Sequence, residues 1–117
     1  MADEDQELAR AFVAWFATRP KHGAAAGYGV LERAERRLNS AIKRGESPSR
    51  LMLCAERVRQ AQLGWIRAQE RAAALPTDVD DEQTRRQCER RAAAQMAWER
   101  ASIEDIIALY STTRAPR

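Results

Sequence analysis

The chain has 117 residues, of which 44% are hydrophobic and 32% charged, and its formal net charge is +3. This length suits one domain, spanning residues 1–117, and the composition is that of a soluble globular protein rather than a disordered one. Two cysteines and one histidine are too few for a disulfide framework or a Cys/His zinc site, and the longest stretch without charge, residues 22–31, is far shorter than the ~20 residues that span a bilayer.

The first predicted helix covers residues 4–19, with residues 1–3 as a frayed end. Its apolar side chains recur at helical spacing and make the most aromatic face of the chain: Leu8, Phe12, Trp15 and Phe16. Pro20 ends the helix because a residue that precedes proline is pushed out of the helical region. A helix of this length is marginal alone, so we expect the aromatic face to be buried.

The second predicted helix covers residues 29–44, with a narrow apolar stripe that includes Leu31, Leu38 and Ala41. Gly45 follows it and fits the left-handed position that commonly ends a helix. Ser47 and Pro48 then predict the start of a third helix, with serine as N-cap and proline in the first helical position.

The middle of the chain predicts a long antiparallel helical hairpin, about 48–74 and 78–110, that turns at Pro76. With the two shorter N-terminal helices it makes an all-α, four-helix bundle-like fold, and residues 112–117 are expected to fray. Ser102 followed by Asp105 could form a new N-cap, which leaves open a break near residues 101–102.

The register of this hairpin predicts where partners are missing. A tight turn at Pro76 would place Trp65 and Ile66 beside residues 85–89, which are mostly charged, so we expect these two side chains to lack apolar partners within the chain. Residues 62–92 would then form a thin tip that projects from a compact base.

The end of the fourth predicted helix is apolar on two sides, which is typical of a helix packed between two neighbours. Either the first two helices fill both sides, or one side makes a homo-oligomer contact with tryptophan as the anchor. The candidate contact residues for a protein partner are Trp65, Ile66, Trp98 and Leu109.

An arginine-rich face on the second and third helices favours an alternative function, nucleic-acid binding. Eight basic side chains could neutralise several phosphates: Arg33, Arg36, Arg37, Lys43, Arg44, Arg50, Arg57 and Arg59. A DNA-binding regulator, or a phage-type packaging or assembly subunit, could use this face. The default interpretation of the same residues is a solvated surface.

The sequence predicts no catalytic, cofactor-binding or metal site. The single histidine, His22, lies in an expected loop without the Asp or Cys that a catalytic relay needs. We therefore predict a cytoplasmic, non-enzymatic protein-interaction module, an adaptor, regulator or assembly subunit, that associates with itself and uses neither a membrane nor a small-molecule substrate.

Overall fold

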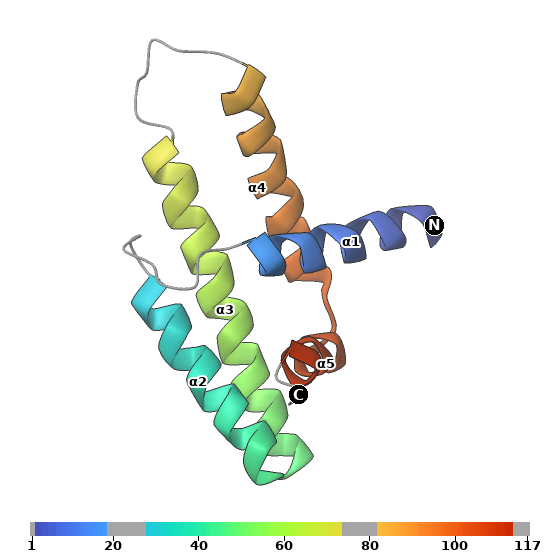
Figure 1. The fold of residues 1–117 in the computed structure, drawn as a ribbon, viewed down its shortest axis with the longest axis vertical. Helices are drawn as coiled ribbons and strands as arrows, with labels where there is room; N and C mark the ends of the chain where they lie inside the picture. Colours follow the sequence, from blue (N-terminus) through green and yellow to red (C-terminus); the bar gives the residue numbers. More distant parts are fainter. Residues whose placement is uncertain (1, 19–27, 74–81, 114–117) are drawn as a thin grey trace.

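A computed structural model of the chain describes residues 2–18, 28–73 and 82–113. Within these ranges the chain forms five helices and no strands, which confirms the all-α class (Figure 1). The helices are α1 (Ala2–Thr18), α2 (Tyr28–Arg44), α3 (Pro48–Ala73), α4 (Glu82–Arg100) and α5 (Ile103–Thr113). Among the described residues, none of the helices is long and apolar enough to cross a membrane.

The connection between α2 and α3 follows the local signals in the sequence. Gly45 has a φ of 68°, and its N–H donates to the Ile42 carbonyl while the N–H of Glu46 donates to the Ala41 carbonyl, each at 3.1 Å. This pair of bonds is a Schellman motif, which satisfies carbonyls that the helix end leaves free. The N–H of Arg50 then donates to Ser47 Oγ at 3.4 Å, so Ser47 caps α3 as predicted.

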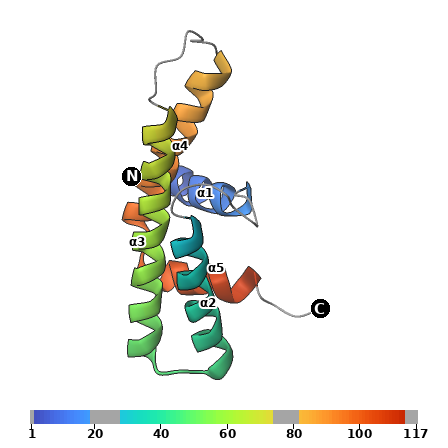
Figure 2. The same cartoon turned by 90° about the vertical axis from the view of Figure 1, so that its left-hand side faces the viewer.

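The predicted fourth helix is in fact two helices that meet at Ser102. The backbone N–H of Asp105 donates to Ser102 Oγ at 3.0 Å, which is the N-cap that the sequence left open. Because the helix breaks here, α5 does not continue along α4 but runs across α2 and α3 (Figures 1 and 2). The fold therefore has five helices rather than four, and the helical hairpin ends at Arg100 instead of residue 110.

Helices α3 and α4 run in opposite directions beside each other, as the sequence predicts, but in a different register (Figure 1). Arg67 Nη2 lies 3.7 Å from Glu99 Oε2, and the Arg59 guanidinium donates to the Ala101 carbonyl. The middle of α3 therefore faces the end of α4, and not residues 85–89 as predicted. That prediction assumed a tight turn at Pro76, which lies outside the described residues.

Helix α1 crosses α3 and α4 at a steep angle (Figures 1 and 2). Its aromatic side chains contact three other helices. Three ring pairs connect it to α4, α3 and α5, with centroid distances of 4.4 Å for Phe12–Trp98, 5.4 Å for Trp15–Trp65 and 4.9 Å for Phe16–Tyr110. Such tilted and edge-on pairs stabilise a core by about 0.5–1.5 kcal/mol beyond the area that they bury. Phe12 is buried and Leu8, Trp15 and Phe16 are partly buried, so the predicted burial of this face is confirmed in part.

The core therefore extends further along the hairpin than the sequence predicts. It includes Trp65 and Ile66, so the projecting tip is shorter than residues 62–92. The part of the hairpin that does project consists of the end of α3 and the first half of α4, where residues 85–90 are all exposed (Figure 1). This shape fits principal dimensions of 51 × 36 × 28 Å.

Candidate interaction surfaces

Three of the four predicted partner-contact residues are buried inside their own chain. Trp65 is 1% exposed, and Ile66 and Trp98 are fully buried. The expectation that Trp65 and Ile66 lack apolar partners is wrong because Trp15 of α1 and Tyr28 of α2 both pack on the Trp65 ring. These three side chains are core residues in this fold and present no surface to a partner.

The fourth predicted contact residue, Leu109, is half-buried and lines an open groove of about 790 Å³ between α1, α4 and α5. We call it the α1–α4–α5 groove. Eight of its lining residues are apolar, and Thr112 is polar: Leu8, Ala9, Phe12, Val13, Ala97, Ala101, Ala108, Leu109 and Thr112. Three charged side chains complete it, Asp5, Arg100 and Asp105, and Arg100 Nη2 lies 3.8 Å from Asp5 Oδ1.

Small side chains leave room for this groove between the helices. Three of its lining residues beyond α1 are alanines: Ala97, Ala101 and Ala108. The chain turns at Ser102, and the first half of α1 extends away from the other helices (Figure 1). Val13, in the second half of α1, lines the groove and is 51% exposed.

A second groove of about 480 Å³ lies between α2 and α3, and we call it the α2–α3 groove. Four apolar residues line it: Val30, Ala34, Leu53 and Ala61. Val30 and Leu53 are 55% and 45% exposed. The other lining residues are polar or charged: Arg33, Arg37, Glu56, Arg57 and Gln60.

The structure brings together only some of the eight basic residues that were predicted to contact nucleic acid. Arg33, Arg37 and Arg57 share the α2–α3 groove. Arg36 and Lys43 are exposed but do not line it.

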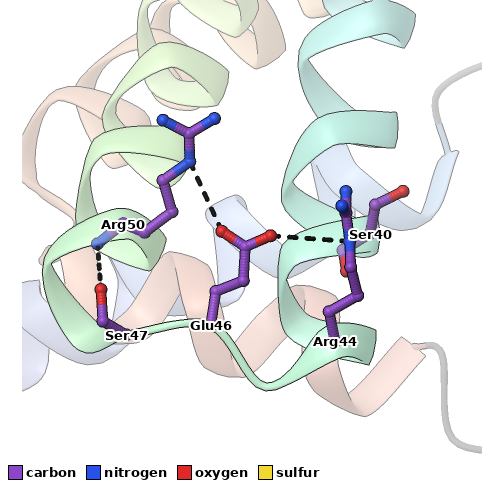
Figure 3. Close-up of polar contacts among 5 residues, drawn as sticks. All are labelled: Ser40, Arg44, Glu46, Ser47 and Arg50. Carbon is purple, nitrogen blue, oxygen red and sulfur yellow. Dashed lines mark hydrogen bonds and ion pairs between the residues drawn. The ribbon is translucent and has the colours of Figure 1, made fainter.

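Arg44 and Arg50 lie at the turn between α2 and α3, where one carboxylate bridges them (Figure 3). Each places its Nε 3.5 Å from an oxygen of Glu46. Arg44 Nε also donates to the Ser40 carbonyl at 3.4 Å. This exposed network ties the end of α2 to the start of α3, and its carboxylate offsets part of the local positive charge.

Arg59 does not belong to the basic face that the sequence predicts. Its side chain is only 17% exposed, pairs with Glu56 at 3.0 Å, and donates to the Ala101 carbonyl at the junction of α4 and α5. Residues of a helix advance by about 100° each, so Arg59 points about 200° away from Arg57. Arg59 therefore satisfies the end of α4 instead of facing the α2–α3 groove.

One buried polar pair was missed by the sequence reasoning. The Tyr110 hydroxyl of α5 donates to a carboxylate oxygen of Glu35 in α2, and both residues are buried. Glu35 lies in the apolar stripe of α2, between Leu31 and Leu38. A carboxylate within such a stripe was the available signal, because a buried acid needs hydrogen-bond donors.

The remaining reactive side chains form no shared site in the described part of the chain. Cys54 is buried, Cys88 is exposed, and both are free thiols. Residues 2–18, 28–73 and 82–113 contain no cluster of three or more His, Cys, Asp or Glu side chains arranged to hold a metal ion. His22 lies outside these residues.

Comparison with protein-family models, with curated proteins and with solved structures found no match for this chain.

Proposed function

We propose that the protein is a binding module that associates with a second copy of itself through the α1–α4–α5 groove. The observation that carries this proposal is the apolar lining of the groove, which leaves Val13 half exposed to water. Covering apolar surface releases about 25 cal/mol per Å², so a partner that fills the groove gains from contacts that the monomer leaves unmade.

The charges around the groove favour a second copy as the partner. Arg100 is positive while Asp5 and Asp105 are negative, so the same patch offers both signs. In a two-fold contact the patch of one subunit meets the identical patch of the other, which requires a self-complementary surface. The overall formal charge of +3 on a 117-residue chain opposes such a contact only weakly.

The dimensions also suit a subunit contact. Helix α1 has 17 residues, which is about 25 Å at 1.5 Å per residue. A stable interface buries about 800 Å² on each partner. The arrangement that we propose to reach this area has two α1 helices lying across one another, each with Val13 on the other subunit's groove.

The solution mass tests this proposal. We expect the wild-type protein to be a dimer by light scattering or sedimentation at about 100 µM, with dissociation on dilution. Val13→Glu should give a monomer with an unchanged helical circular dichroism spectrum, because burying an unpaired carboxylate in an apolar contact is costly. Val30→Glu is the matched control, since Val30 is equally exposed but lies in the other groove.

Three results would contradict self-association through this groove. A wild-type protein that stays monomeric at that concentration removes the proposal altogether. If the Val13→Glu variant still forms the dimer, the contact lies on another surface. The same conclusion holds if Val30→Glu abolishes the dimer as fully as Val13→Glu.

A further inference from the structure

The α2–α3 groove combines free positive charge with uncovered apolar surface. Val30 and Leu53, one from each helix, are about half exposed there. Arg33, Arg37 and Arg57 lie around them, and none of the three forms an ion pair with another described residue. Neither feature is used by the packing of the described residues against one another.

We propose that this groove binds an amphipathic helix of a partner protein, with apolar side chains on one stripe and Asp or Glu on both sides of it. Helices commonly bind in this way, with residues at i, i+3 or i+4, and i+7 in an apolar groove. The partner's stripe contacts Val30, Leu53 and their small neighbours. Its carboxylates pair with the arginines, whose planar guanidinium suits two parallel hydrogen bonds to a carboxylate.

The length of the groove sets the length of this partner segment. From Val30 to Arg37 the helix rises about 10 Å, and from Leu53 to Ala61 about 12 Å, at 1.5 Å per residue. Two to three turns of a partner helix cover that distance. Ala34 and Ala61 are small, which allows the partner helix to approach the floor closely.

The same geometry disfavours nucleic acid as the occupant. A phosphate backbone gains from a continuous track of cations and nothing from an apolar floor. The track is interrupted here: Glu56 lines the groove, and Arg44 and Arg50 share Glu46. Arg59 points away from this groove, toward the junction of α4 and α5. Three arginines around an apolar floor suit an acidic amphipathic helix better than a duplex.

This inference goes beyond the proposed self-association, because the two grooves share no lining residue. A dimer formed through α1 and α5 leaves the α2–α3 groove open. The Val13→Glu variant should therefore keep the binding described here, and failure of one proposal does not decide the other.

The test uses the full chain and a synthetic helical peptide with leucines at i, i+3, i+4 and i+7 and glutamates on both flanks. A matched peptide carries lysine in place of each glutamate. Titration of isotope-labelled protein, followed by the backbone amide resonances, should shift signals of α2 and α3 around the groove with the glutamate peptide only. Arg37→Glu should weaken the affinity about tenfold, since it removes an ion pair and adds repulsion.

Arg36→Glu is the matched control, because it makes the same charge change on an exposed residue of the same helix outside the groove. It should leave the affinity within about twofold. The proposal is overturned if the glutamate peptide shifts no groove signal at about 1 mM. It is also overturned if Arg36→Glu weakens binding as much as Arg37→Glu. A short DNA duplex that binds the same amides more tightly than the peptide at equal salt would assign the groove to nucleic acid instead.

Discussion

Truncation of Trp65 to alanine should destabilise the fold itself and not a subunit contact. The ring is 1% exposed and lies between Trp15 at 5.4 Å and Tyr28 at 5.3 Å, so it joins α1, α2 and α3. Removal of a buried tryptophan costs about 3–5 kcal/mol, and the loss of two ring pairs places this variant in the upper half of that range. The total free energy of unfolding of a domain of this size is only about 5–15 kcal/mol.

The free energy of unfolding should be measured by urea denaturation, followed by far-ultraviolet circular dichroism at two protein concentrations about tenfold apart. If Trp65 is a core residue, the difference between variant and wild type is the same at both concentrations. Leu53→Ala is the control, since that side chain is 45% exposed and should change the stability by less than about 1 kcal/mol. Trp65→Phe keeps a ring in the site, so it should lower the free energy of unfolding by less than Trp65→Ala.

Two outcomes would refute this reasoning. A loss below about 1 kcal/mol would mean that the three helices do not meet on the Trp65 ring. A difference that grows or shrinks with protein concentration would place Trp65 at a contact between subunits, as the sequence alone suggests, and not in the core.

Three further substitutions test individual contacts, each by the same urea assay. Ser102→Ala should lower the free energy of unfolding by about 1 kcal/mol because it removes the cap that starts α5. An unchanged urea midpoint would show that the backbone N–H of Asp105 needs no acceptor from Ser102. Gly45→Ala should cost about 1–2 kcal/mol, since φ is 68° and nothing lies near the added methyl group; no loss would count against the left-handed turn. Tyr110→Phe should cost about 1–3 kcal/mol because it removes a donor to the buried Glu35 carboxylate, and a neutral or stabilising effect would argue against that bond.

Only part of the candidate surfaces could be predicted from the sequence. The exposure of the arginines of α2 follows from helical periodicity, and the structure bears it out. Periodicity does not show that Arg33, Arg37 and Arg57 line one groove. That grouping depends on which sides of α2 and α3 face each other. Of the residues that line the α1–α4–α5 groove, only Leu109 was predicted from the sequence to contact a partner.

The sequence by itself determined the local features of this protein: the all-α class, the end of α2 at Gly45, the cap of α3 at Ser47 and the aromatic face of α1. These depend on residues within about four positions of each other, so the chain encodes them wherever the helices later lie. Only the tertiary structure decided that Trp65 and Trp98 are core residues and that Arg59 satisfies the end of α4. Those outcomes depend on the path of α1 across the hairpin and on the register of α3 against α4, which no local pattern specifies.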